Sequence, residues 1–162
     1  MASNSDRFTE PPWFADVAGI VYAIQGRAGQ TTVAKLKRSA PAELLAAAPD
    51  LLETLEAATE CLTRHMPQLR TGPLGPDALR AKDQAESAIH QAKNGLADLT
   101  GGREWEVPVE LPPPERRANA RLLGAASDLR EAARSVRAIV ATLADCAGVS
   151  DALNSVIRRT NG

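Results

Sequence analysis

The feature that most constrains the fold of this 162-residue chain is a phrase that occurs twice. The stretch AELLAAAPDLLE at residues 42–53 aligns with ARLLGAASDLRE at residues 120–131. In both stretches the apolar residues recur every three or four positions, which is typical of an amphipathic helix of several turns. The shared spacing predicts two equivalent helices whose buried residues superpose: Leu44 on Leu122, Leu51 on Leu129 and Ala58 on Val136.

The segments that follow the two phrases also correspond. After the first, a Pro/Gly-rich loop at residues 66–76 leads into a helix that Asp77 can cap and that Asn94-Gly95 can end through its preference for αL geometry. After the second, the short loop CAGVS leads into a helix at residues 151–162. Each copy is therefore predicted to be a helical hairpin.

A helix break is predicted at the same point in both copies. Pro49 lies inside the first repeated phrase, where a proline kinks or restarts a helix. Its counterpart in the second copy is Ser127, which is followed by Asp128 and is a good helix cap.

An extended segment with a tryptophan precedes each hairpin. Residues 11–38 carry β-branched and aromatic residues on both sides of a turn at Gly26–Gly29, which predicts two strands. Residues 103–115 are a shorter version, in which apolar residues alternate before a proline run that stops the strand. The alternating residues are Trp105, Val107, Val109 and Leu111.

The predicted fold class is α+β, mostly α. Two βαα repeats pack their helical hairpins into a four-helix core with a small β-hairpin or strand element. The expected division is a flexible N-terminus at 1–12, repeat 1 at 13–100 and repeat 2 at 101–162, with Gly101-Gly102 at the junction. Only 3% of the residues are aromatic and alanine dominates the apolar residues, which favours close helix packing.

The two copies resemble a family of small phage and prophage accessory proteins. In that family a short Trp-bearing β segment precedes a helix of the type NARLIAAAPDLLEAL. Residues 119–122 keep the opening of this motif and residues 47–52 keep its continuation, whereas Pro41 replaces the Asn in copy one and Ser127 replaces the Pro in copy two. The resemblance implies a phage origin and a role in handling the host, including action against a defence system. It supplies no catalytic residues.

The sequence contains no strong catalytic signature. The segment GRAGQTT at residues 26–32 lacks the Lys-Ser/Thr pair of a phosphate-binding loop and is predicted to be a hairpin turn. Cys61 and His65 lie one helical turn apart, but His90 is expected at the other end of the hairpin, so a full ligand set is lacking. Cys61 and Cys146 are expected to be buried or idle thiols. We therefore expect no metal, no cofactor and no enzymatic activity.

Charge and hydropathy indicate the compartment. The net charge is −1, no apolar run approaches the roughly 20 residues of a membrane span, and the N-terminal residues contain no apolar leader. We expect a protein of the host cytoplasm, with neither a membrane nor a nucleic acid as its partner.

An arginine stripe is the predicted binding site. Arg130, Arg134 and Arg137 follow at i, i+4 and i+7, and Arg121 is placed on the turns before them. Guanidinium groups bind carboxylates and phosphates well, so the expected ligand is a small phosphate-bearing molecule or a host defence protein. The alternative is that these arginines pair with the protein's own acids, within one chain or between chains.

Leu52 and Leu55 are the predicted oligomer interface. Their counterparts are Arg130 and Ala133, so the first copy has the wider apolar face, and surplus apolar surface often marks an interface. We expect a homo-oligomer. The predicted function is a phage-encoded, non-enzymatic binding protein that blocks a host defence protein or sequesters a nucleotide signal. The alternative is a structural protein whose charged faces serve only self-assembly.

Overall fold

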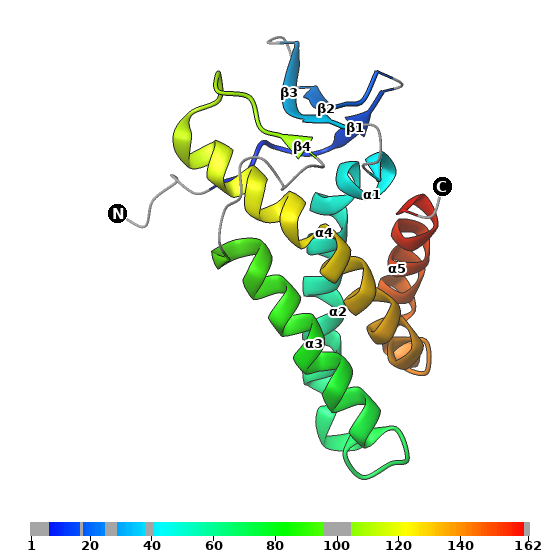
Figure 1. Ribbon diagram of the computed structural model, residues 1–162. Coiled ribbons are helices and arrows are strands. Elements are labelled where there is room, and N and C mark those ends of the chain that lie inside the picture. Colours follow the sequence, from blue (N-terminus) through cyan, green and yellow to red (C-terminus); the bar gives the residue numbers. More distant parts are fainter. Residues whose placement is uncertain (1–6, 17, 25–28, 38–40, 96–104, 161–162) are drawn as a thin grey trace.

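The fold is α+β and mostly helical, with a four-stranded sheet at one end of a group of packed helices (Figure 1). This confirms the predicted fold class. The junction expected at Gly101-Gly102 and most of the turn expected at Gly26–Gly29 lie outside the described residues. The computed structural model describes residues 7–16, 18–24, 29–37, 41–95 and 105–160.

The strands form one antiparallel sheet in the order β1-β2-β3-β4. Their bounds are Trp13–Ala15 (β1), Ile20–Ile24 (β2), Gln30–Leu36 (β3) and Trp105–Glu106 (β4). The sequence predicted two strands before the first helix, but the structure has three because Asp16 turns the chain after β1. Its Oδ1 accepts hydrogen bonds from the backbone N–H groups of Ala18 (2.9 Å) and Ile20 (3.0 Å).

The strand β4 joins the two halves of the chain. It comes from the predicted second repeat, yet it pairs with β3 of the first, opposite Lys35 and Leu36. The strand is shorter than predicted, since Val109, expected on its buried face, is 74% exposed. One sheet therefore serves both halves.

Helices α2 and α4 lie against each other in the centre, with α3 on one side of the pair and α5 on the other (Figure 1). None of the described helices combines the length and apolarity that crossing a bilayer requires. The helix bounds are Ala42–Ala46 (α1), Ala48–Leu69 (α2), Gly75–Asn94 (α3), Pro113–Val140 (α4) and Ala147–Thr160 (α5), with a 3-10 turn, η3, at Ala144–Cys146.

The two repeated helices are buried in the same phase, as the sequence predicted. The paired positions are at most 3% exposed in both halves: Leu44 and Leu122, Leu51 and Leu129, Ala58 and Val136. Helix α3 buries mainly alanines, which lets its backbone approach α2 and α4 closely: Ala78, Ala81, Ala85, Ala88 and Ala92. The four-helix core is thus built from leucine-rich central helices and an alanine-lined flanking helix.

The predicted helix break occurs in one half only. Helix α1 ends at Ala46 and α2 restarts at Ala48, with Pro49 in the first turn of α2. In the second half, the break predicted at Ser127 is wrong, because α4 runs through this residue without interruption. Serine keeps the backbone N–H that a helix interior requires, whereas proline lacks it.

The two ends of α3 also differ from the sequence-based expectation. The helix begins at Gly75, so Asp77 lies in its first turn, makes no capping bond and instead pairs with Arg80 (3.7 Å). Gly95 does end the helix, but in an extended conformation (φ −70°, ψ 177°) and not in αL. A Cβ at Gly95 would lie 2.5 Å from the carbonyl oxygen of Gln91, so glycine is needed there for space.

The segment before β1 packs against α4. Thr9 is 1% exposed, its backbone N–H donates to Asn119 Oδ1 (2.7 Å), and Asn119 Nδ2 donates back to Thr9 Oγ1 (2.7 Å). The indole N–H of Trp13 donates to the Thr9 carbonyl oxygen (2.8 Å). Thr9, which the sequence predicted to belong to a flexible N-terminus at 1–12, is therefore held to the helical core.

Candidate functional site

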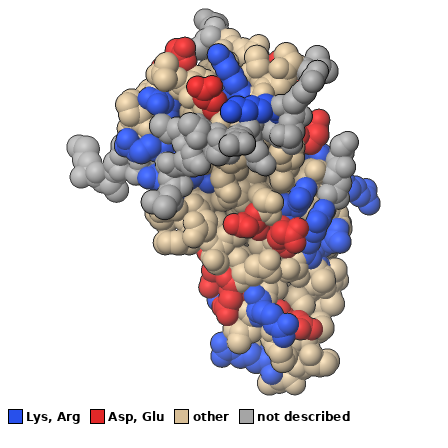
Figure 2. Space-filling view, in the orientation of Figure 1, with Lys and Arg blue, Asp and Glu red and all other residues tan. Residues whose placement is uncertain are grey.

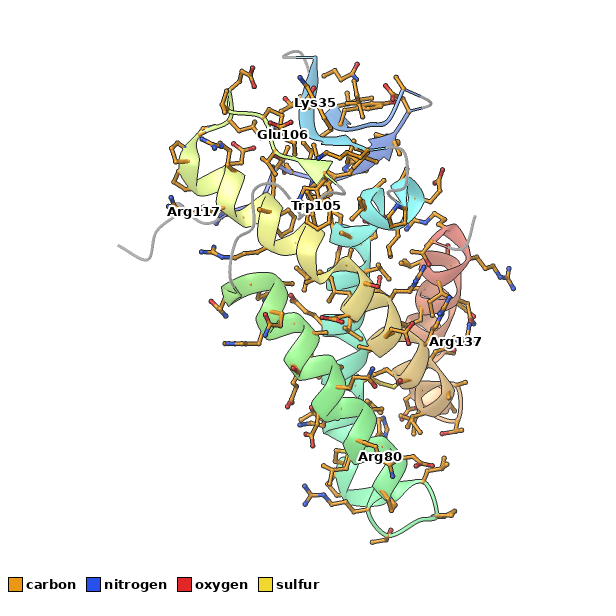
Figure 3. All side chains as sticks on the ribbon, in the orientation of Figure 1. Lys35, Arg80, Trp105, Glu106, Arg117 and Arg137 are labelled. Carbon is orange, nitrogen blue, oxygen red and sulfur yellow. A yellow bond between two sulfur atoms is a disulfide. The ribbon has the colours of Figure 1, made fainter. Side chains whose placement is uncertain are left out.

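The predicted arginine stripe does not form one continuous face. The spacing of Arg130, Arg134 and Arg137 puts them on one side of α4. Figure 3 shows Arg137 beside α5, and Figure 2 shows basic side chains gathered in this region. Arg121 precedes Arg130 by about two and a half helical turns, so it points to the other side of α4. There its Nε–H donates to the carbonyl oxygen of Gly95 (3.0 Å). We call the remaining three residues the arginine face.

One ion pair of the arginine face joins two residues of α4. Arg134 Nη1 lies 3.4 Å from Glu131 Oε1, an exposed pair of the kind that contributes under about 1 kcal/mol. Arg130 Nε is buried without a hydrogen-bond partner, and Arg137 has no ion pair among the residues that the structure describes. Arg137, which is half-buried, can therefore present its guanidinium group to carboxylate or phosphate oxygens from outside.

Leu52 and Leu55 do not lie on a free surface. They are 4% and 0% exposed and belong to the core of their own chain. The apolar face of α2 is wide because α2 packs against α3, α4 and α5 at once. The argument that surplus apolar surface at these two leucines marks an oligomer interface therefore does not hold.

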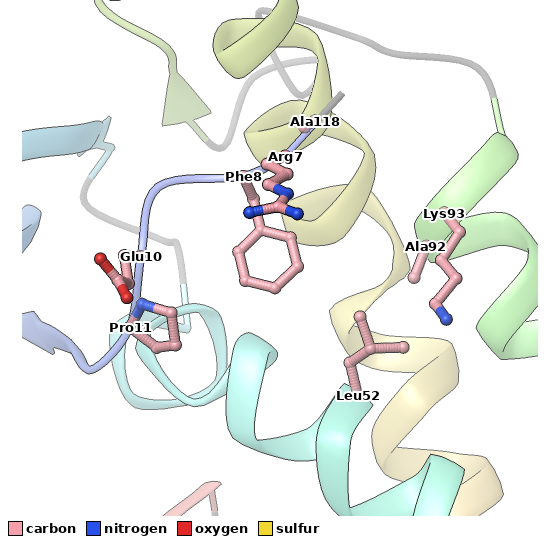
Figure 4. Close-up of a pocket in the computed structure, with 8 residues that line it drawn as sticks. All are labelled: Arg7, Phe8, Glu10, Pro11, Leu52, Ala92, Lys93 and Ala118. Carbon is pink, nitrogen blue, oxygen red and sulfur yellow. The ribbon is translucent and has the colours of Figure 1, made fainter. Parts of the chain in front are cut away.

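A pocket of about 530 Å³ opens where the N-terminal segment meets three helices (Figure 4). We call it the N-terminal pocket. Its apolar lining comes from all four elements: Phe8 and Pro11 from the segment, Leu52 from α2, Ala92 from α3 and Ala118 from α4. The volume lies within the range of small-molecule sites, about 300–1,000 Å³.

Charged side chains surround the apolar lining of the N-terminal pocket. Arg7, Glu10 and Lys93 line it, and all three are exposed. Lys93 Nζ lies 2.8 Å from Glu56 Oε1 on α2, which holds the ammonium group beside the opening. Phe8 also meets Trp13 edge-to-face at 6.1 Å between ring centroids, so its ring is fixed in position. Sequence reasoning missed this site because its lining residues are far apart in the chain.

The structure also brings together a cysteine pair that the sequence left apart. Cys61 on α2 is joined to Cys146 on η3 in a disulfide with a Cα–Cα distance of 6.5 Å, so the expectation of two idle thiols is wrong. His65 lies next to both sulfur atoms. The burial of Cys61 could be predicted from the helical periodicity of the first repeat. Its contact with Cys146, 85 residues later in the chain, could not.

The segment GRAGQTT leads into a strand. Residues 30–32 belong to β3, and Gly29 has φ +84°, as a turn glycine does. A phosphate-binding loop would lead into a helix N-terminus instead. The rest of this turn, residues 25–28, lies outside the described residues.

Comparison with known proteins identifies a phage family. The chain matches the family of Salmonella phage P22 protein Y8K6 over residues 1–103. The match contains strands β1–β3, helices α1–α3 and every pocket-lining residue except Ala118, whereas the arginine face lies beyond it. No curated protein and no solved structure matches the chain significantly. Because the match covers more than half of its residues, the chain belongs to the family of the Salmonella phage P22 protein Y8K6.

Proposed function

We propose that this phage protein is a non-enzymatic binding protein that interferes with a host factor. It does so by sequestering a small phosphate-bearing molecule, of the nucleotide class, in the N-terminal pocket. The observation that carries the proposal is the pocket itself, in which one aromatic ring and two cationic side chains line the same cavity of about 530 Å³.

The lining matches the chemistry of a nucleotide. A base can stack on the ring of Phe8, an interaction worth about 1–3 kcal/mol per base in nucleic-acid-binding proteins. Arg7 and Lys93 supply the donors that phosphate oxygens require, and Glu10 can accept a hydrogen bond from an exocyclic amino group. The apolar residues around Phe8 can pack against the faces and edges of the base.

The proposed role in infection starts from membership of a phage family. A phage protein that removes a nucleotide signal from the host would silence a defence that this signal activates. The position of the pocket supports this interpretation, since seven of its eight lining residues fall within the family match and a shared family function would reside there. The end of the match at residue 103 also supports a division of the chain into two tandem copies near residue 100.

A second candidate function is the blocking of an acidic host protein by the arginine face. The absence of an ion pair at Arg130 and Arg137 among the described residues favours it. Such a function would be particular to this chain, because the arginine face lies outside the family match.

Calorimetric titration of the full chain tests the pocket. The titrants are adenosine and guanosine mono- and triphosphates, with inorganic phosphate as the reference. We expect micromolar binding of at least one nucleotide and a loss of tenfold or more in Arg7→Glu/Lys93→Glu, since each charge-assisted hydrogen bond is worth about 1.5–3 kcal/mol. The matched control is Arg64→Glu/Arg80→Glu, which makes the same charge change at exposed residues of α2 and α3 outside the pocket. Equal weakening in both variants, or no nucleotide binding, would contradict the proposal.

An infection assay separates the two candidates. A phage that lacks this protein is complemented with the wild type, the pocket variant or Arg130→Glu/Arg137→Glu. If the pocket carries the function, only the pocket variant fails to restore plaque formation. If the arginine face carries it, only the arginine variant fails.

A further inference from the structure

A cluster of metal-ligand residues lies where α2 meets η3. Cys61 and His65 are one turn apart on α2, and Cys146 is the last residue of η3. The two sulfur atoms and a ring nitrogen of His65 all lie within 4.8 Å of one another. Both cysteines are buried, and the imidazole side chain is 17% exposed. This placement provides three convergent ligands of the types that zinc prefers.

We propose that the reduced protein binds one Zn²⁺ at this cluster. The ligands are Cys61 Sγ, Cys146 Sγ and His65 Nε2, with the Asp145 carboxylate as the fourth. Tetrahedral zinc has Zn–S distances of about 2.3 Å and Zn–N distances of about 2.0–2.1 Å, which place neighbouring ligand atoms about 3.3–3.8 Å apart. The Asp145 carboxylate lies outside the group of atoms within 4.8 Å of one another, so its side chain must turn toward the sulfur atoms to complete the site.

The side chains around His65 are of the kind found around a metal-bound histidine. Its Nδ1 lies 3.3 Å from Gln68 Oε1, so a hydrogen on Nδ1 can be donated to this oxygen. The lone pair of Nε2 is then free to bind a cation, and the hydrogen bond to Gln68 orients the ring. On the far side of the ring, Asp145 Oδ2 lies 3.9 Å from Nε2, and this side chain is 84% exposed. A metal ion can therefore enter from solvent past Asp145.

The disulfide alone does not account for this arrangement. A disulfide needs neither an imidazole nor a carboxylate beside it, whereas a zinc site needs both sulfur atoms and further ligands. The disulfide and the zinc site use the same two sulfur atoms and exclude each other. When Zn²⁺ binds, two Zn–S bonds form and two thiol protons leave to solvent, so no electron transfer is involved. Formation of the thiols from the disulfide takes two electrons and two protons from a cellular thiol reductant.

Either link connects the two halves of the chain. Cys61 and His65 belong to the first half, and Asp145 and Cys146 to the second. The zinc ion would thus hold the α4–α5 connection against α2 under reducing conditions, where a disulfide does not persist. The chain would keep this cross-link in both redox states.

The test uses the full chain reduced with a phosphine, which competes little for zinc, and then freed of metal. ZnCl₂ is added, with MgCl₂ as the control, and bound metal is measured by elemental mass spectrometry after gel filtration. We expect one zinc per chain, no bound magnesium and no zinc on the oxidised protein. Replacement of Zn²⁺ by Co²⁺ is expected to give a thiolate-to-cobalt charge-transfer band.

Variants assign the ligands. Cys61→Ser and Cys146→Ser are expected to lose stoichiometric binding, and His65→Gln to weaken it tenfold or more. Because buried serines can unfold the chain, His65→Gln and Asp145→Asn, at more exposed positions, keep the test decisive. The control is His90→Gln, at an exposed position of α3, which is expected to bind as the wild type does.

Three outcomes would overturn the proposal. The first is a folded, reduced chain that binds no zinc at micromolar free metal. The second is equal binding by the wild type, His65→Gln and Cys61→Ser. The third is a disulfide that the phosphine cannot reduce while the protein stays folded, because the ligands would then never become available.

Discussion

Thr9 and Asn119 hold each other by two hydrogen bonds of 2.7 Å, although 110 residues separate them in the chain. Thr9 Oγ1 also donates to Glu115 Oε1 (2.6 Å), so the backbone N–H, the carbonyl and the hydroxyl of Thr9 all have partners. Asn119 is the first residue of the motif Asn-Ala-Arg-Leu. Through these bonds the asparagine fixes the segment that forms one wall of the N-terminal pocket.

Asn119→Ala is expected to destabilise the protein by about 1–3 kcal/mol, because it leaves the buried N–H of Thr9 without an acceptor. Thermal unfolding followed by circular dichroism should show a lower Tm, by roughly 2–4 °C per kcal/mol for a chain of this size. The control is Asn154→Ala on α5, where the side chain is only half-buried. If both variants lower the Tm by a similar amount, the contact between Asn119 and Thr9 does not stabilise the fold more than an ordinary half-buried asparagine does.

Leu51→Ala and Leu129→Ala are each expected to cost about 2–4 kcal/mol, because each removes a fully buried side chain from the same position of the two repeated helices. Urea unfolding measures both. Leu79→Ala, at a residue that is 42% exposed, serves as the control and is expected to cost much less. A large loss in only one of the two buried variants would argue against their equivalence.

Two glycine substitutions are expected to change the free energy of unfolding in opposite directions. Gly95→Ala would place a methyl group 2.5 Å from Gln91 O, and the resulting strain is expected to cost about 1–3 kcal/mol. Gly148→Ala meets nothing within 4 Å and lies in α5, so reduced freedom of the unfolded chain is expected to add about 0.4–1 kcal/mol. Calorimetry of the two variants checks the pair, and destabilisation by both would contradict the described geometry at Gly148.

Reduction of the disulfide in the presence of a chelator is expected to lower the free energy of unfolding by roughly 2–5 kcal/mol, because the link closes a long loop. The comparison is Cys61→Ala/Cys146→Ala, whose Tm should not respond to the reductant. If the reductant does not change the Tm of the wild type either, the cross-link does not stabilise the fold.

The sequence predicted the helices and their buried residues better than it predicted which elements pack around them. The burial of Leu44, Leu51 and their counterparts was readable because helical periodicity is a local signal. The surroundings of Leu52 were not, because whether an apolar residue faces its own core or a partner depends on how many helices pack around it. Grouping Arg121 with Arg130 overlooked the helical spacing, because nine residues turn Arg121 half-way around α4.

The candidate sites were harder to predict for the same reason. Phe8, Leu52 and Lys93 come from three elements, and no spacing along the chain indicates that they line one cavity. Cys61 and Cys146 likewise meet only because the α4–α5 connection packs against α2. Such relationships are tertiary, and the repeat signal carried no information about them.

The contribution of β4 to the sheet has a consequence for protein synthesis. The ribosome synthesises Thr9 and β1 to β3 well before it reaches residues 105–106 and Asn119. During that interval β3 presents an unpaired edge, and the segment around Thr9 has nothing to bind. Unpaired strand edges attract other chains, so the nascent protein is most exposed to aggregation and to chaperones at this stage. The first half of the chain therefore completes its structure only after translation of the second half has begun.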